Sequence, residues 1–314
     1  MFDFFIKDFE RAKKSSLLQK NKNLKDLTTF KINCIAKVYI KINCLFDLNL
    51  LITLASKYNI KTICLGGGSK VLFCTKKYKG VVYTLGGDFE KIEPIENGLV
   101  VGSGVKMATL SNYCNKNNLS CVEWGLGIPC TIGGGVYTNA GCFRKSFADI
   151  VIKVIYTDGK HIFERKNSQC EFGYRKSFFY GKNYVILFVY LSAKPSKENI
   201  KKITLQNFNK KVSLQPYNYP SVGSIFKSAI LPSPLFIEAF GLKGLKIGGA
   251  EVSNKHCGFI INKKNATSSN VLKIIYKIKK TVWKKGGIIL HNEIILLGAK
   301  KHGIFWWLPY THCL

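Results

Sequence analysis

Two glycine-rich segments contain the residues whose types and spacing most clearly suggest chemistry. The first, Leu65–Leu72, reads LGGGSKVL, and the second, Gly125–Gly141, reads GLGIPCTIGGGVYTNAG. Glycines let backbone N–H groups approach an anion closely. Neither segment is a Walker A loop, and Gly102–Met107 (GSGVKM) lacks the third glycine of the Rossmann fingerprint. Tight turns would explain either segment alone, but the two together favour a dinucleotide site of a non-Rossmann kind.

Further candidates lie in the C-terminal third of the chain. Ser221–Lys227 reads SVGSIFK, so that the hydroxyl of Ser224 stands between a glycine and an aromatic residue, with Lys227 three residues on. Glu293 directly precedes an apolar stretch typical of a buried strand. A turn, a helix cap or a solvated charge would explain each of these features taken singly.

Cysteine and histidine spacing does not predict a metal site. The chain has 11 cysteines and five histidines, but it contains neither a Cys-x-x-Cys pair nor a His-x-x-x-His pair. The segment 1–14 mixes acids with a short apolar run, so we expect no signal peptide. We therefore expect free thiols in a reducing cytoplasm.

The composition restricts the class of protein. The 314 residues carry a formal charge of +30, and 46% of them are hydrophobic. Only Arg11, Arg144, Arg165 and Arg175 are arginines. Because nucleic-acid sites favour arginine, we expect the lysine excess to reflect codon usage in an A/T-rich genome, although its field could attract phosphate-bearing ligands. The longest apolar stretch, Tyr184–Ala193, is about half the ~20 residues that a spanning helix needs, so no membrane association is expected.

The elements that must position these residues alternate irregularly between strand and helix. Ile35–Ile42 (IAKVYIKI) alternates like a half-buried strand, and a helix is possible in the polar segment 1–28. Further strands are predicted at Ile60–Leu65, Gly80–Leu85, Gly98–Gly102, Ile150–Thr157, His161–Phe163, Tyr184–Ala193 and Ile294–Leu297, and helices at Asp47–Tyr58, about Lys194–Lys211 and from Thr267 or Ser268 to Gly286. This order predicts an α+β fold. The apolar tail His302–Leu314 is either packed on the core or a drifted terminus.

Six motifs in order make the chain resemble the UDP-N-acetylenolpyruvoylglucosamine reductase family. They are GGGS, GIPxTIGGxVYxNAG, YRxSxF, GSxFK, GGAEVS and HxGFIxN, and the likeness runs from about Thr28 to Gly298. The tight spacing around Glu171–Phe179 and Lys211–Ser221 resembles the shorter form of the family, which lacks an inserted substrate loop. The resemblance implies an N-terminal segment at 1–28, an FAD-binding domain of the vanillyl-alcohol-oxidase (PCMH) type at 29–198, and a smaller α+β substrate-binding domain at 199–314.

The resemblance also implies an activity and its cofactors. Hydride passes from NADPH to FAD and then to the enolpyruvyl group of UDP-N-acetylglucosamine enolpyruvate, which gives UDP-N-acetylmuramate for peptidoglycan. It implies a cytoplasmic flavoprotein that acts in cell-wall biogenesis without nucleic acid, membrane or an obligate protein partner. The residues implied to bind FAD are Gly66, Gly67, Gly68, Ser69, Gly127, Ile128, Pro129, Gly133, Gly134, Asn139, Ala140 and Gly141. We expect Ile128, Pro129 and Ile132 to supply an apolar wall for the isoalloxazine ring.

Three residues match the catalytic positions of the family. Arg175 would face the substrate carboxylate, Ser224 would donate the proton, and Glu293 would help to hold the enol-like intermediate, either protonated or strongly hydrogen-bonded. Tyr174 and Lys227 are expected to contact the substrate, and we hypothesise that Lys227 lies close enough to Ser224 to stabilise its alkoxide.

The chain also departs from the family pattern. Lys70 stands where the family usually has Asn, Ser228–Ala229 replaces Asn-Pro, Asn33–Cys34 replaces Gly-Gly, and Asn292 replaces Pro. Since the catalytic positions are intact, we interpret these departures as drift. Two alternatives stay open: another flavin enzyme of the same fold that uses oxygen, and a degenerate, inactive binding protein that holds nucleic acid through its lysines.

Overall fold

Two compact units make up the chain, and each is assembled from separate segments. The structure, a computed structural model, describes residues 1–228 and 231–299. The first unit comprises residues 1–22, 36–67 and 79–210, and the second comprises residues 23–35, 68–78, 211–228 and 231–299 of the described chain. This division differs from the continuous ranges 1–28, 29–198 and 199–314 expected from the sequence, because two short early segments belong with the C-terminal part.

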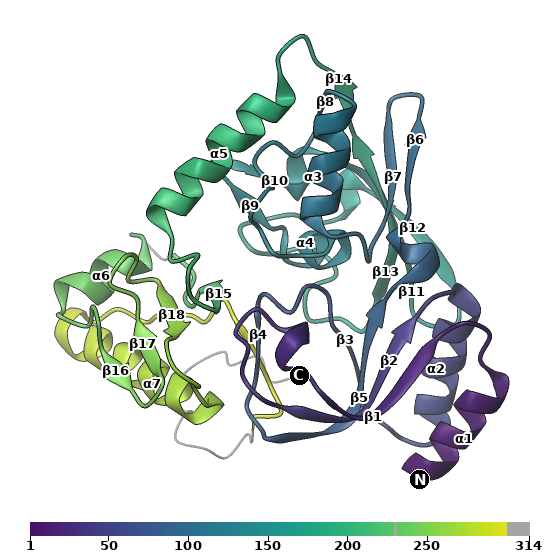
Figure 1. The fold of residues 1–314 in the computed structure, drawn as a ribbon, viewed down its shortest axis with the longest axis horizontal. Helices are drawn as coiled ribbons and strands as arrows, with labels where there is room; N and C mark the ends of the chain where they lie inside the picture. The colour runs from purple at the N-terminus through teal and green to yellow at the C-terminus, as the bar shows by residue number, and fades with distance from the viewer. Residues whose placement is uncertain (229–230, 300–314) are drawn as a thin grey trace. The chain divides into compact units, whose positions relative to one another are not determined.

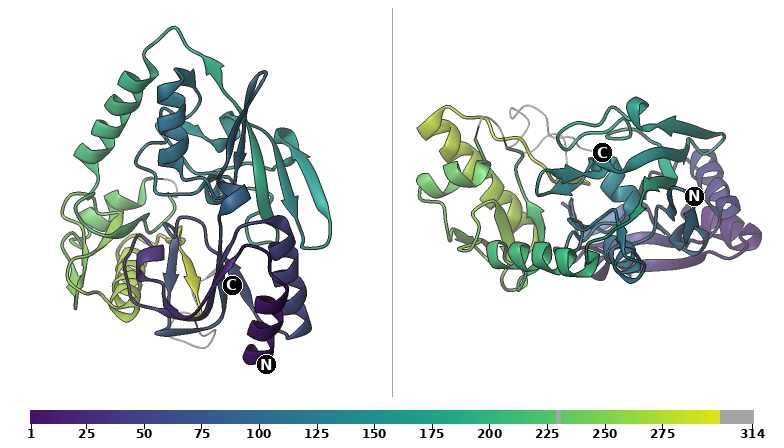
Figure 2. Two further views of the ribbon diagram at one scale, coloured as in Figure 1. Left: turned by 45° about the vertical axis from the view of Figure 1, so that its right-hand side comes forward. Right: turned by 90° about the horizontal axis from the view of Figure 1, so that it is seen from above.

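The first unit contains a sheet covered by the N-terminal helices. Its strand order is β1 (Leu17–Asn23), β2 (Ile35–Ile42), β5 (Lys77–Leu85) and β3 (Thr62–Cys64), and β3 runs parallel to β5. Helices α1 (Phe2–Ala12) and α2 (Leu45–Lys57) pack side by side next to this sheet (Figures 1 and 2). Phe5 and Phe9, one turn apart in α1, are fully buried in the same core as Val38 and Ile40 of β2. The alternating pattern of β2 therefore faces these helices, as predicted.

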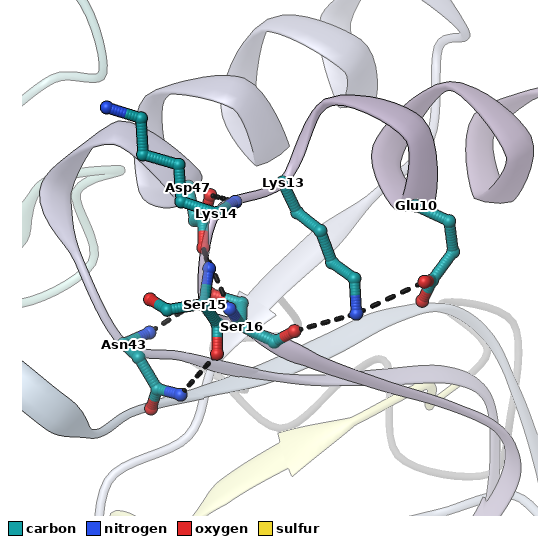
Figure 3. A network of polar contacts seen from close by, with 7 residues as sticks. All are labelled: Glu10, Lys13, Lys14, Ser15, Ser16, Asn43 and Asp47. Carbon is teal, nitrogen blue, oxygen red and sulfur yellow. Dashed lines mark hydrogen bonds and ion pairs between the residues drawn. The ribbon is translucent and has the colours of Figure 1, made fainter.

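Asp47 fastens the segment that follows α1 to the beginning of α2 (Figure 3). Its buried carboxylate accepts hydrogen bonds from the backbone N–H groups of Lys14 (2.7 Å), Ser15 (3.0 Å) and Ser16 (2.9 Å). Burial alone would raise the pKa of Asp47, but these hydrogen bonds outweigh it and hold the pKa below its ordinary value. The carboxylate also lies in the first turn of α2, where the helix dipole favours negative charge.

A second sheet forms the rest of the first unit. It is antiparallel throughout, in the order β12 (Ile162–Lys166), β11 (Val151–Thr157), β13 (Val185–Ser192), β7 (Gly98–Gly102) and β6 (Ile92–Ile95). Helix α4 (Ile132–Thr138) packs on β13 and β7, and α3 (Met107–Lys116) contributes Met107 and Leu110 to the same core. The short strands β8 (Leu119–Ser120) and β14 (Lys194–Pro195) pair with each other, as do β9 (Gly141–Cys142) and β10 (Lys145–Ser146). Helix α5 (Ile200–Leu214) follows, and 3₁₀ turns occur at Lys25–Leu27, Gly87–Glu90, Phe147–Asp149 and Asn167–Gln169.

The second unit is an antiparallel sheet packed against a long helix. The strand order is β15 (Ser221–Ser224), β18 (Phe259–Asn262), β17 (Ala250–Val252) and β16 (Lys246–Ile247). Helix α7 (Ser268–Gly286) packs against β16 and β17 and contacts α6 (Ser233–Ala239) (Figures 1 and 2). Thr267 caps α7 by accepting the N–H of Asn270, and Gly287 ends it with a φ of 65°.

A parallel strand pair joins an early segment to the C-terminal part of the second unit. Strand β4 (Val71–Phe73) pairs with β19 (Ile295–Leu297), with Val71 opposite Ile295. Leu72 and Leu296 are buried in the same core as the apolar face of α7. The mixture of strands and helices confirms the α+β prediction. Among the helices of the described residues, none is long and apolar enough to cross a membrane.

Candidate functional site

The two glycine-rich segments meet in the first unit. A Cβ on Gly66 would lie 2.8 Å from the hydroxyl oxygen of Thr131, and a Cβ on Gly67 would lie 2.9 Å from the Cα of Cys130 and overlap the carbonyl oxygen of Pro129. Such separations leave no room for side chains, so the two backbones can touch only because both positions are glycine. Segments more than 60 residues apart in the sequence thus form one surface.

The glycines of the second segment divide into two kinds. Thr131 caps α4 and accepts the N–H of Gly134. Gly133 and Gly135 are buried: a Cβ on Gly133 would press on Ser103, and one on Gly135 would press on the ring of Phe147. The N–H of Gly133 is already bonded to the carbonyl of Ser103. Gly134 stays partly exposed and has Gly66 among the nearest neighbours of its added Cβ. Gly66, Gly67 and Gly134, here called the glycine surface, are therefore the backbone that a phosphate group can approach most closely, and the N–H of Gly134 is already bonded to Thr131.

The loop before α4 has a mixed character. Gly127 takes a φ of 85°, and Ile128 is partly buried against the core. Pro129 is exposed, whereas Ile132 is fully buried. Of the three residues expected to form an apolar wall, Ile132 thus belongs to the core of the unit, and Ile128 and Pro129 reach its surface.

Gly68 and Ser69 belong to the second unit. Gly68 has a φ of 61°, a left-handed conformation that favours glycine, and its carbonyl accepts the N–H of Thr29. A Cβ here would lie 2.7 Å from the Cα of Thr28. Ser69 is half-buried and leads directly into Lys70 and β4.

Arg175 stands in a tight turn of the first unit. Gly173 and Lys176 exchange backbone hydrogen bonds of 3.0 and 3.2 Å across this turn. Arg175 is half-buried, takes a φ of 52° that non-glycine residues rarely adopt, and donates from its guanidinium to the carbonyl of Gly141 at 3.4 Å. The exposed ring of Tyr174 lies 5.2 Å from the guanidinium carbon. Strained backbone of this kind is concentrated at functional sites.

Asn139 holds this turn against the second glycine segment. Its buried side chain donates to the carbonyl of Gly173 at 2.9 Å and accepts the N–H of Ala148 at 3.0 Å. Asn139 itself is the left-handed C-cap of α4. Among the residues expected to bind the cofactor, Asn139 and Gly141 thus contact the arginine turn, and Ala140 lies between them.

Tyr137 provides two more ties between α4 and the arginine segment. Its carbonyl accepts the hydroxyl of Ser177 at 2.8 Å, and its own hydroxyl accepts the N–H of Gly181 at 2.9 Å. Burial raises the pKa of Tyr137 in spite of the opposing hydrogen bond from Gly181. The phenol therefore stays neutral near pH 7. The segment that follows Arg175 is held to α4 at two places, Ser177 and Gly181.

Ser224 and Glu293 lie on neighbouring extended segments of the second unit. Ser224 ends β15, and the N–H of Glu293 donates to the carbonyl of the next residue, Ile225, at 2.7 Å. Two residues further on, the N–H of Lys227 donates to the carbonyl of His291 at 2.9 Å. The side chain of Glu293 is buried, whereas Ser224 is half-buried. Two of the three expected catalytic residues are thus brought together, and the ammonium position proposed for Lys227 stays a prediction.

Lys70 is a member of this cluster that the motifs did not identify. Its ammonium lies 2.7 Å from Oε1 of Glu293 and donates to the carbonyl of Ser224 at 3.0 Å. The only signal in the sequence was that Lys70 departs from the family pattern. Ala229, another departure, lies outside the described residues.

The comparisons with known proteins agree with the motifs. Residues 36–162 match a family model described as an FAD binding domain, and residues 215–297 match one described as UDP-N-acetylenolpyruvoylglucosamine reductase, C-terminal domain. The proteins of that name from Borreliella burgdorferi and Bacillus subtilis are 36% and 32% identical to this chain, over 92% and 90% of it and 97% and 94% of their own lengths.

A solved structure extends the likeness to the fold. The crystal structure of UDP-N-acetylenolpyruvylglucosamine reductase from Thermus caldophilus matches 90% of this chain and 98% of its own, with a TM-score of 0.76 and 26% identity. These matches confirm an FAD-binding domain followed by the C-terminal domain of the reductase. Relatives more than 30% identical span almost the whole chain, and the chain therefore belongs to the UDP-N-acetylenolpyruvoylglucosamine reductase family.

Proposed function

We propose that this chain reduces UDP-N-acetylglucosamine enolpyruvate to UDP-N-acetylmuramate in peptidoglycan synthesis, with FAD as its cofactor and NADPH as the reductant. The observation that carries this proposal is that curated relatives of this one name match over nine-tenths of the chain. The partly exposed Gly66 and Gly134 of the glycine surface fit a dinucleotide, since neither position carries a side chain that would hinder the approach of a pyrophosphate. FAD, when bound, accepts hydride from NADPH and delivers it to the substrate.

Arg175 would meet the charge that develops in the second half-reaction. When hydride adds to C3 of the enolpyruvyl group, negative charge appears on C2 and spreads onto the carboxylate. A planar guanidinium can hold both carboxylate oxygens, and a cation fixed in advance stabilises the charge without reorganising. The ties from Asn139 to Gly173 and from Arg175 to Gly141 supply that fixation.

Ser224 and Glu293 would complete the addition across the double bond. The hydroxyl of Ser224 gives its proton to C2, so that hydride and proton together convert the enolpyruvyl ether into a lactyl ether. Glu293 supports the enol-like intermediate beside it. The close approach of their two backbone segments supports this pairing of roles.

The reaction itself provides the test. Purified protein should contain FAD. Beyond the one equivalent that reduces the flavin, it should consume NADPH only when the enolpyruvyl UDP-sugar is present, while a product heavier by two hydrogens appears in the mass spectrum. An FAD-containing protein that consumes oxygen instead and leaves the UDP-sugar unchanged would indicate an oxidase of the same fold. A colourless protein that binds DNA at physiological salt would contradict the proposal altogether.

We also propose a cytoplasmic enzyme that acts on small phosphate-bearing molecules and needs no nucleic acid, membrane or obligate protein partner. NADPH, FAD and the UDP-sugar all carry negative phosphates, and the chain carries a formal charge of +30. Such a field raises the rate at which anionic substrates arrive. Size-exclusion chromatography at increasing concentrations and a DNA-binding assay would test the proposed lack of partners.

A further inference from the structure

One ammonium connects the two C-terminal residues to which the proposed function assigns catalytic roles. The Nζ of Lys70 lies 2.7 Å from Oε1 of Glu293, whose side chain is only 6% exposed, and 3.0 Å from the carbonyl oxygen of Ser224. A carboxylate buried to this degree is costly unless a cation and hydrogen bonds compensate it. A hydrogen bond from an ammonium to a carboxylate at such a distance is among the strong hydrogen bonds of proteins.

The backbone around Lys70 fixes the direction of its side chain. The carbonyl of Lys70 accepts the N–H of Ile295 at 2.8 Å, at the point where β4 and β19 begin to pair. Gly223 has a φ of 73°, and a Cβ at this position would lie 3.2 Å from the lysine ammonium. The glycine that precedes Ser224 therefore leaves the space that the ammonium occupies.

From these contacts we propose that Lys70 is a positioning residue, which keeps Glu293 ionised and oriented and holds the backbone of Ser224 in place for the reduction. This inference rests on the proposed function. An unpaired carboxylate beside C2 would repel the negative charge that develops there. Paired with the ammonium, it adds no net charge, so the hydride transfer meets no such opposition.

The fold does not require this ammonium. Strand β4 is held to β19 by backbone pairing, and Leu72 and Leu296 pack in the core of the second unit. Lys70 itself is half-buried, with a side chain 27% exposed. Replacement of its side chain should therefore leave the fold intact, although the Glu293 carboxylate that loses its cation will lower the stability.

The experiment uses rapid mixing of the FAD-loaded enzyme and follows the flavin absorbance in each half-reaction separately. We expect Lys70→Met to slow oxidation of the reduced flavin by the UDP-sugar about 10- to 100-fold per bound flavin, while reduction by NADPH changes less than about twofold. The saturated rate should fall rather than the apparent affinity for substrate. Lys70→Arg, which keeps the cation, should recover most of the lost rate.

A double-mutant cycle separates positioning from a general structural effect. If Lys70 acts through Glu293, Lys70→Met should add little to the loss already caused by Glu293→Gln. Lys243→Met is the matched control, because Lys243 pairs with Glu238 at 2.6 Å in the same unit but on an exposed surface. It should leave both half-reactions unchanged. Lys70→Met should lower the unfolding temperature, because it leaves the buried Glu293 carboxylate without its cation, whereas Lys70→Arg and Lys243→Met should change it little.

Three results would overturn the inference. They are a normal second half-reaction in Lys70→Met, a loss that Lys70→Arg does not recover, and losses that add fully to those of Glu293→Gln. If the parent enzyme itself leaves the UDP-sugar unreduced, the proposed function fails instead, so the two failures are distinguishable.

Discussion

Substitution of Ser224 can separate the proposed proton donation from the binding of cofactor and substrate. Removing its hydroxyl deletes the proton donor but leaves hydride transfer from NADPH untouched. We expect Ser224→Ala to slow product formation by about 10²- to 10⁴-fold, the usual contribution of a positioned general acid, while NADPH still reduces the flavin at the parent rate. Ser221→Ala, at the other end of β15, is the matched control and should be active. Equal loss in both half-reactions would indicate a damaged fold and not a missing proton donor.

Arg175 tests whether shape as well as charge is needed. Arg175→Lys keeps the cation but loses the planar pair of donors, which grips both oxygens of a carboxylate. Steady-state kinetics should show kcat/KM for the UDP-sugar reduced about 10- to 100-fold, with flavin reduction preserved. Full activity in Arg175→Lys would mean that the guanidinium does not hold the carboxylate.

The motifs pointed to individual residues but not to the contacts that these residues make. Ser224 and Glu293 were singled out by motif, and the structure brings their segments, 69 positions apart in the sequence, together through backbone pairing. The contact of Lys70 with Glu293 could not be predicted, because a lysine after a glycine loop is usually a solvated charge. The role of Asn139 in cofactor binding stays a prediction, and no pattern in the sequence could reveal the hydrogen bonds of its buried side chain to Gly173 and Ala148.

Among the elements, the contact between the two glycine segments is sensitive to substitution at one position and tolerant at another. A methyl group on Gly67 would overlap the Pro129 carbonyl, whereas one on Gly134 would have its nearest neighbour, the Thr131 hydroxyl, at 3.3 Å. Gly67→Ala should therefore lower both the unfolding temperature and the FAD content. Gly134→Ala should fold normally but bind FAD more weakly, because its methyl group enters the glycine surface. FAD titration of the apoprotein and thermal unfolding would measure both effects, and unchanged FAD affinity in both variants would contradict the assignment of this surface.

The hydrogen bonds of Asp47 predict how much the attachment of the N-terminal helices contributes to stability. Asp47→Asn should destabilise the protein by about 2 kcal/mol near pH 7, since it weakens the charged hydrogen bonds to the backbone of Lys14, Ser15 and Ser16. The folded-state pKa lies below the ordinary 3.8, so the contribution of the carboxylate is full above that pH and is lost as the pH falls below it. Denaturant unfolding at several pH values would measure this. Asp26→Asn, which affects only an exposed pair with Lys31, should change stability little, and an equal effect of the two substitutions would contradict the role of Asp47.

Periodicity predicted the long elements and missed the short ones. Strand β2 has the predicted bounds, and α7 begins after the predicted cap Thr267. Helix α4 was not predicted, since IGGGVYT has three glycines and a poor helix propensity, and packing against Ser103 and Phe147 compensates for this. The small strands β16 and β17 were also missed, because two or three residues carry too little pattern.

For the whole molecule, the division into units could not be predicted from local patterns. The segments 23–35 and 68–78 precede most of the first unit in the chain, yet they pack with residues beyond 211. The parallel pairing of β4 with β19 explains this, and it is a contact across more than 220 residues. The expected boundaries at 28 and 198 made each domain one continuous range, and motifs along the chain carry no information about such long-range pairing.

The net charge gives a prediction for the molecule as a whole. If the field of +30 assists the arrival of phosphate-bearing substrates, kcat/KM for NADPH and for the UDP-sugar should fall as salt rises from about 0.01 to 0.15 M, over which the screening length shortens from about 30 to 8 Å. The rate at saturating substrate should change much less. Salt-independent kcat/KM would mean that the lysine excess has no part in substrate capture.

If the proposed function is correct, the reduced flavin of this protein passes its electrons to the enolpyruvyl UDP-sugar. The most direct measurement is a single turnover without oxygen, in which NADPH-reduced enzyme is mixed with UDP-N-acetylglucosamine enolpyruvate. The proposed function predicts that the oxidised flavin spectrum returns as one UDP-N-acetylmuramate forms per flavin. A flavin that stays reduced in the presence of the UDP-sugar and is reoxidised only when air is admitted would contradict it.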